Sequence, residues 1–253
     1  MFNKAYGYIL KHPATKRGYW GVWYYRQRYE QVLMRLSRVC QKEGRIMLLE
    51  LGCASGIYAR YLREKGFECY YVGCDIERKS LKLAYRGKDI AYVLCDIHQL
   101  PFIPKCANVI LCSEVLEHVS DPYNTVARLS ELVAKTLIIT FPEERLLSLL
   151  RDRHPEHVSP IDKQNLINAL MSKKLKIVFS SQIFSSFVPC GLLEFLGISR
   201  NGLSQAVVYS IDKLLMKIVP SSLTPHETII IEAVRPHIDY AISTPATTTL
   251  FSG

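Results

Sequence analysis

The chain has 253 residues, of which 49% are hydrophobic and 22% are charged, and its formal net charge is +9. This composition is typical of a globular protein with a sizeable core, and it excludes a fibrous or wholly disordered chain. No apolar run reaches the ~20 residues that a membrane-spanning helix needs. Residues 1–17 lack the unbroken apolar stretch of a secretory signal. We therefore expect a soluble, cytoplasmic protein whose cysteines are reduced.

The positive charge is concentrated near the N-terminus. Residues 1–45 carry a net charge of +8, whereas the other 208 residues carry +1. Basic and aromatic residues alternate there, a composition that attracts phosphates and stacks on bases. Apolar residues recur at steps of three and four over residues 22–40, which predicts an amphipathic helix ended by Gly44. Two interpretations stay open: a solvated helix whose aromatic side chains pack inward, or a surface for an anionic partner.

Strands and helices are predicted to alternate along the next part of the chain. Five apolar runs of strand length alternate with three helical stretches, and the connections between them are short. Such alternation is typical of a parallel sheet covered by helices on both faces. The predicted strands span residues 46–51, 69–74, 90–95, 108–112 and 136–141, and the predicted helices span residues 55–65, 77–85 and 121–134.

The remaining chain adds one helix, two strands and an insertion between those strands. The helix is predicted at residues 162–172 and the strands at residues 175–180 and 227–234, with a further helix at 203–219 inside the insertion. We therefore predict a basic aromatic helical segment, one main domain with an insertion, and a loosely held tail. Their predicted bounds are residues 1–45, 46–235 (insertion 181–226) and 236–253.

A glycine-rich turn follows the first predicted strand. The segment LELGCASG places Gly52 and Gly56 between a strand and a helix, where the backbone can approach a ligand closely. The spacing fits neither the dinucleotide fingerprint nor the P-loop. Acidic residues, Asp75, Asp96 and Glu114, follow the next three strands. Such carboxylates can accept hydrogen bonds from ribose hydroxyls or an adenine amino group, and three in succession are difficult to explain as helix caps alone.

Five motifs in a fixed order resemble the class I S-adenosylmethionine-dependent methyltransferases: LELGCASG, YYVGCDI, CDIHQLPF, VILCSEVLEHVSDP and LIITFP. The similarity covers about residues 48–170. It is greatest to the methyltransferases related to ubiquinone and menaquinone biosynthesis (methyltransferase type 11). The resemblance implies a Rossmann-like α/β fold with a seven-stranded, mostly parallel sheet, helices on both faces and the last strand antiparallel. One departure is Ala54, where the family most often has glycine.

The resemblance also implies S-adenosylmethionine as the cofactor and assigns residues around it. By similarity, Asp75 binds the ribose, Asp96 with Ile97 binds the adenine, and Ser113 lies near the methionine end. Glu50 and the backbone of the glycine-rich turn face the methionine part. The predicted cofactor-binding residues are Glu50, Gly52, Cys53, Ala54, Ser55, Gly56, Asp75, Ile76, Asp96, Ile97 and Ser113.

A general base is needed only if the methyl acceptor arrives protonated, as a hydroxyl does. The candidate catalytic residues are Glu114, His118 and His157. We expect Glu114, Glu117 and His118 on one face of a helix, with His154 and His157 after the fifth strand. This set partly resembles the metal ligands of small-RNA 3′-terminal 2′-O-methyltransferases. Because the EVLEHV run is widespread in metal-free members of the larger group, we assign no metal ligands.

Three functions remain open at this stage. The first is methyl transfer to oxygen or carbon of a small or lipid-like acceptor, for which the apolar insertion is suited. The second is an RNA methyltransferase that uses the basic residues 1–45, with binding that weakens steeply with salt. The third is a non-catalytic cofactor-binding protein of the same fold. The fold does not determine the acceptor.

Overall fold

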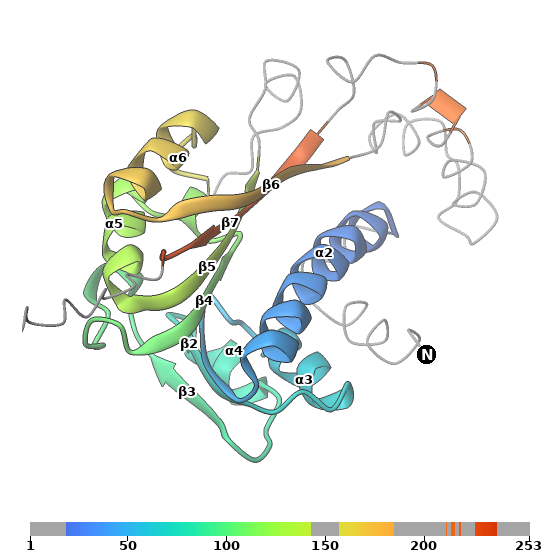
Figure 1. Ribbon diagram of the computed structural model, residues 1–253. Helices are drawn as coiled ribbons and strands as arrows, with labels where there is room; N and C mark the ends of the chain where they lie inside the picture. Colours follow the sequence, from blue (N-terminus) through green and yellow to red (C-terminus); the bar gives the residue numbers. More distant parts are fainter. Residues whose placement is uncertain are drawn as a thin grey trace, which may run out of the picture.

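The computed structural model describes residues 19–142, 157–184, 211, 214–215, 218 and 226–236 (Figure 1). The strands are β1 (Ile46–Leu51), β2 (Cys69–Asp75), β3 (Ile90–Leu94), β4 (Ala107–Ser113), β5 (Val133–Pro142), β6 (Lys176–Phe184) and β7 (His226–Val234). The helices are α2 (Tyr19–Glu43), α3 (Ile57–Glu64), α4 (Arg78–Leu83), α5 (Pro122–Leu132) and α6 (Lys163–Ser172), and two 3₁₀ turns are η2 (Ile97–Gln99) and η3 (Leu116–His118).

The strands form one sheet of order β3-β2-β1-β4-β5-β7-β6. Strands β1 to β5 pair in parallel, whereas β7 is antiparallel to both β5 and β6. The parallel strands therefore end at one common edge of the sheet, where ligands of open α/β sheets bind. This topology confirms the predicted Rossmann-like fold with seven strands and an antiparallel last strand.

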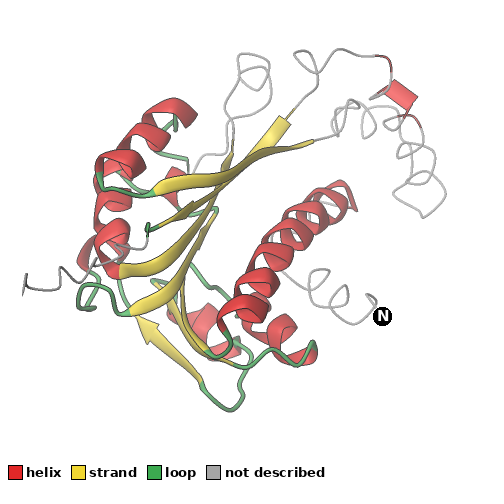
Figure 2. Cartoon of the chain, viewed as in Figure 1, coloured by secondary structure: helices red, strands yellow, loops and turns green. Residues whose placement is uncertain are grey.

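Helices cover both faces of the sheet (Figure 2). Helices α5 and α6 lie on one face and α2 and α3 on the other (Figure 1). The apolar face of α2 supplies Val32 and Leu36, both fully buried, to the second core. Helix α2 ends at Glu43, and Gly44 follows with φ of 72°, as the sequence predicts for a glycine past a helix end.

Several predicted boundaries differ from the structure by a few residues, and two of them have a clear cause in strand pairing. The helix predicted to run to residue 134 ends at Leu132, because Val133 pairs with Ala107 as the first residue of β5. Strand β6 continues to Phe184, past its predicted end at residue 180, because its antiparallel pairing with β7 extends that far.

The predicted tail and most of the predicted insertion lie outside the described residues. Residues 211, 214, 215 and 218 are helical, in agreement with the helix predicted at residues 203–219. In the described part of the chain, no helix is long and apolar enough to cross a membrane.

Candidate functional site

A pocket with a volume of about 160 Å³ opens at the carboxyl ends of β1, β2 and β3. Five of the predicted cofactor-binding residues line it: Gly52, Asp75, Ile76, Asp96 and Ile97. The other lining residues are Leu51, Cys74, Cys95, His98, Leu100, Val115, His118 and Val119. The structure thus brings the glycine-rich turn and the ends of the next two strands to one concave site.

The glycines of the turn are required by both backbone conformation and space. Gly52 has φ of 67°, and a Cβ atom there would lie 2.3 Å from Cγ2 of Val115. Gly56 has φ of 69°, and its Cβ atom would lie 2.2 Å from the Tyr92 hydroxyl. A side chain at either position would therefore meet a neighbour and also adopt a left-handed backbone that favours glycine.

Asp75 joins the end of β2 to the glycine-rich turn. One carboxylate oxygen accepts a 2.8 Å hydrogen bond from the amide of Ala54, and the other accepts a 2.8 Å bond from the amide of Glu77. Ala54 has φ of 44°, a left-handed conformation that glycine adopts without a side-chain penalty. Asp75 therefore fixes the backbone at Glu77, just after β2, and also stabilises the left-handed conformation of Ala54.

Asp96 lines the pocket and is the N-cap of η2. Its Oδ1 atom accepts a hydrogen bond from the amide of His98 at 2.9 Å, and the same Oδ1 lies 2.8 Å from Nδ1 of the His98 ring. These hydrogen bonds hold the pKa of Asp96 below its usual value. The sequence prediction missed His98 as a lining residue, although its position two residues after Asp96 in CDIHQLPF is a usable signal.

Glu50 is buried, with 3% of its surface exposed, and accepts a hydrogen bond from the Tyr71 hydroxyl. Burial raises the pKa of Glu50 to about 8, against the opposite effect of the Tyr71 hydrogen bond. Glu50 does not line the pocket, and neither do five other residues that the sequence predicts to bind the cofactor. These are Cys53, Ala54, Ser55, Gly56 and Ser113.

Ser113, at the end of β4, belongs to a chain of hydroxyl groups. Its Oγ lies 2.9 Å from Oγ1 of Thr140 and 3.4 Å from the hydroxyl of Tyr58. Thr140 donates its own hydrogen to Glu114 at 3.0 Å, so Ser113 must donate to Thr140. The sequence prediction missed Tyr58 and Thr140, because they come from α3 and β5 and only the fold brings them to Ser113.

Glu114, at the end of this series of hydrogen-bonded hydroxyl groups, forms an ion pair with Arg28 of α2. The distance between Nη1 of Arg28 and Oε2 of Glu114 is 2.7 Å. Arg28 has only 7% of its surface exposed. Glu114 has φ of 55°, and its amide donates to the carbonyl of Thr140 at 2.9 Å. The sequence prediction missed this role of Arg28, which stands out in the sequence only as one of the basic residues of segment 1–45.

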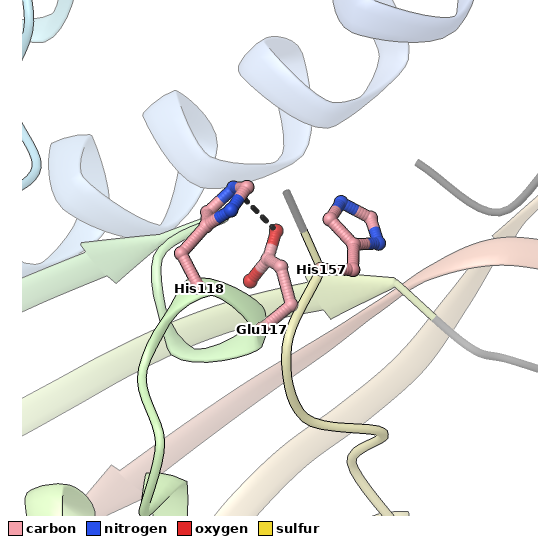
Figure 3. A group of neighbouring side chains, drawn as sticks. All are labelled: Glu117, His118 and His157. Carbon is pink, nitrogen blue, oxygen red and sulfur yellow. Dashed lines mark ion pairs between the residues drawn. The ribbon is translucent and has the colours of Figure 1, made fainter. Parts of the chain in front are cut away.

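Glu117, His118 and His157 form a second group next to the pocket (Figure 3). One potential ligand atom from each lies within 4.8 Å of the others. Glu117 is buried, its Oε1 lies 3.9 Å from Nε2 of His118, and the rings of His118 and His157 are 5.1 Å apart. The carbonyl of Glu117 accepts hydrogen bonds from the amides of Val158 and Ser159, which fixes the segment carrying His157.

The prediction that Glu114, Glu117 and His118 share one face of a helix is wrong. Only residues 116–118 form a helical turn, and that turn is 3₁₀. The left-handed conformation of Glu114 breaks the helical path before it starts. As a result, Glu114 pairs with Arg28, whereas Glu117 and His118 lie with His157. His154 lies outside the described residues.

Residues 49–137 match a family model described as a methyltransferase domain. The chain is also 34% identical over 92 residues to a ubiquinone biosynthesis O-methyltransferase of Chromobacterium violaceum, and 29% identical over 109 residues to one of Serratia proteamaculans. These alignments cover 34% and 40% of this chain and 39% and 44% of the relatives. The chain thus matches less than half of the length of either relative. An RNA acceptor receives no support from the comparisons.

Solved structures share the fold at low identity. A magnesium protoporphyrin IX methyltransferase of Synechocystis with bound S-adenosylhomocysteine aligns with a TM-score of 0.61 and 15% identity, over 92% of this chain and 94% of that one. An S-adenosylmethionine-dependent methyltransferase of Archaeoglobus fulgidus aligns with a TM-score of 0.57 and 21% identity, over 81% of this chain and 94% of that one. Residues 49–137 thus carry a methyltransferase domain, and the described part of the chain has the fold of S-adenosylmethionine-dependent methyltransferases.

Proposed function

We propose that the protein transfers a methyl group from S-adenosylmethionine to an oxygen or carbon atom of a small or lipid-like acceptor. The observation that carries this proposal is the pocket, which joins Gly52 to Asp75 and Asp96 at successive strand ends. The names of the matched relatives, ubiquinone biosynthesis O-methyltransferases, support a small molecule methylated on oxygen.

Within the pocket, each end of the cofactor has a candidate partner. Asp75 is positioned to accept the ribose hydroxyls, because its carboxylate borders the pocket at the end of β2. Asp96 and Ile97 would hold the adenine, with Ile97 offering an apolar surface and Asp96 an acceptor for the amino group. The methionine part would extend toward Gly52 and Ser113, at the ends of β1 and β4.

S-adenosylmethionine supplies an electrophilic methyl group, which forms a bond to the acceptor as the carbon–sulfur bond breaks. The protein mainly supplies alignment and a dry site for such a displacement. If the acceptor is a hydroxyl, a base must take its proton. We assign this role to His118, which lines the pocket. Glu114 is less suited, because its carboxylate already pairs with Arg28 and accepts a hydrogen bond from Thr140.

A release assay for S-adenosylhomocysteine tests this function with defined acceptors. Purified protein is incubated with S-adenosylmethionine and either a catechol with a prenyl side chain, a simple phenol or single-stranded RNA. We expect turnover with a small aromatic hydroxyl and a large loss of turnover in the variant His118→Ala. Turnover with RNA alone, or cofactor binding without turnover on any acceptor class, would contradict the proposed function.

A second candidate function is a metal-assisted form of the same reaction, and it rests on Glu117, His118 and His157. One carboxylate and two imidazoles form a donor set that suits Zn²⁺ and leaves a coordination position open. A divalent ion held there would lower the pKa of an acceptor hydroxyl. His118 also lines the cofactor pocket, so this ion would lie at the border of the cofactor site.

Metal titration followed by calorimetry tests this candidate without an activity readout. We expect Zn²⁺ to bind with one ion per chain, and His157→Ala to weaken binding at least about tenfold. His98→Ala is the matched control, because His98 lines the pocket but lies outside the three-residue group. Equal affinity of wild type and His157→Ala would exclude this site.

A further inference from the structure

Helix α2 lies outside the matched methyltransferase domain, which starts at residue 49, yet its buried Arg28 pairs with Glu114, the neighbour of the pocket residue Val115. The guanidinium of Arg28 lies 2.7 Å from the Glu114 carboxylate, and their side chains are 8% and 19% exposed. Both charges have lost most of their hydration, so each depends on the other. Removing one partner of such a pair leaves an uncompensated buried charge.

Glu114 has a backbone conformation that a residue with a side chain rarely adopts. Its φ is 55°, and this left-handed conformation persists only where surrounding contacts fix it. Three contacts do so: its amide donates to the Thr140 carbonyl, Thr140 Oγ1 donates to its carboxylate, and Arg28 pairs with the other carboxylate oxygen. The two contacts with Thr140 come from β5, whereas the Arg28 contact comes from helix α2.

The residue after Glu114 packs directly on the glycine-rich turn. Val115 lines the pocket, and its Cγ2 atom is 2.3 Å from the position that a Cβ atom on Gly52 would occupy. The backbone conformation of Glu114 therefore sets where Val115 meets Gly52. A change in the Arg28–Glu114 pair has a direct route to the pocket through these two neighbouring residues.

We propose that Arg28 is a positioning residue for the cofactor pocket: its ion pair fixes Glu114 and, through it, the contact of Val115 with Gly52. Cofactor affinity then depends on this ion pair of α2 with Glu114, and not on the other contacts that attach α2 to the sheet. This inference rests on the proposed function, since it concerns the same pocket and its cofactor.

Arg35 offers a matched control on the same helix. It also forms a shielded ion pair, with Glu232 at 3.3 Å, and its guanidinium lies 3.2 Å from the centre of the Phe179 ring. These contacts attach α2 to β7 and β6, whereas the pocket lies at the ends of β1, β2 and β3. Loss of Arg35 should weaken the docking of α2 without changing the Glu114 turn directly.

The test compares Arg28→Gln, Arg28→Lys and Arg35→Gln by calorimetric titration with S-adenosylhomocysteine and by thermal unfolding. We expect Arg28→Gln to weaken binding about tenfold or more, Arg28→Lys to recover part of that loss, and Arg35→Gln to stay within about twofold of wild type. Both glutamine variants should lower the unfolding temperature. Equal losses of affinity in Arg28→Gln and Arg35→Gln, or no loss in Arg28→Gln, would overturn the proposal.

The double variant Arg28→Gln/Glu114→Gln extends the test to the case in which Arg28→Gln alone does not fold. It removes both charges, so no buried carboxylate is left uncompensated. We expect its loss of affinity to be smaller than the sum of the two single losses, or smaller than that of Glu114→Gln if only that single variant folds. Additive losses would contradict the pairwise role of Arg28. If wild-type protein does not bind S-adenosylhomocysteine, the proposed function fails first.

Discussion

The carboxylate of Asp75 accepts a 2.8 Å hydrogen bond from the amide of Ala54, in the middle of the glycine-rich turn. The two residues are 21 positions apart in sequence, at the end of β2 and just after β1. The contact stabilises Ala54 at φ of 44°, where glycine is the usual residue. One carboxylate at the pocket thus organises the turn that the cofactor would contact.

Asp75→Asn should weaken the binding of S-adenosylhomocysteine about tenfold, because it removes a charged acceptor from both the turn and the ribose side of the pocket. Asp89→Asn is the matched control. Asp89 pairs with Arg45 at 2.7 Å and does not line the pocket, so this variant should bind as wild type does. Calorimetric titration of both variants checks the prediction. Unchanged affinity in Asp75→Asn would show that the ribose assignment is wrong.

Ala54→Gly should bind S-adenosylhomocysteine as tightly as wild type and fold with equal or greater stability. Relief of the left-handed alanine is worth about 1–2 kcal/mol, and the added freedom of glycine in the unfolded chain offsets about 0.4–1 kcal/mol of this. Ala127→Gly, inside α5, should instead lose about 1 kcal/mol. Denaturant unfolding measures both changes. A loss at residue 54 as large as that at residue 127 would refute the strain argument.

Gly52→Ala should cost more stability than Gly44→Ala, although both glycines have positive φ, of 67° and 72°. A Cβ atom at Gly44 meets nothing within 4 Å, whereas at Gly52 it meets Val115. We expect losses of about 1 kcal/mol for Gly44→Ala and about 2–4 kcal/mol for Gly52→Ala. Gly52→Ala should also lose affinity for S-adenosylhomocysteine. Equal stability of the two variants would contradict the packing of Val115 on the turn.

The pocket could be predicted from the sequence because its parts are local. Gly52, Asp75 and Asp96 each lie directly after an apolar strand, and parallel strands bring their carboxyl ends to one edge. The apolar runs also located the strands, with errors only at boundaries. At residue 133, for example, pairing with β4 overrode the helical pattern that precedes it.

The polar surroundings of Glu114 could not be predicted in the same way. Arg28, Tyr58 and Thr140 are far apart in sequence and meet only after α2, α3 and β5 have packed on β4. The helical spacing expected for Glu114 and Glu117 failed for a local reason, because a left-handed residue cannot continue a helix. No pattern of residue types in SEVLEH shows that conformation.

Glu50 should make the stability of the protein fall as pH rises toward 8. Burial raises the pKa of Glu50 from its ordinary value of 4.5 to about 8 in the folded state. The folded protein therefore holds a proton that the unfolded chain has released, and the stability that this proton contributes is complete below pH 4.5 and is lost as pH rises through about 8. Glu50→Gln resembles the protonated form and should show a smaller decline.

Denaturant unfolding of wild type and Glu50→Gln across this pH window checks that prediction. The control is Glu64→Gln, since Glu64 is an exposed residue of α3 that pairs with Arg60 one turn away in the same helix. Its pH dependence should follow wild type. If Glu50→Gln and wild type lose stability in parallel between pH 5 and pH 8, Glu50 is ionised in the folded protein throughout.

Calorimetric titration of the full chain with S-adenosylmethionine and S-adenosylhomocysteine tests the central claim most directly. The pocket at the ends of β1, β2 and β3 predicts binding of one molecule per chain, with a dissociation constant on the order of micromolar. Competition between the two compounds for this single site should be complete. Absence of binding for both compounds at concentrations of about 1 mM would contradict the account, because the fold would then hold a pocket with a different ligand.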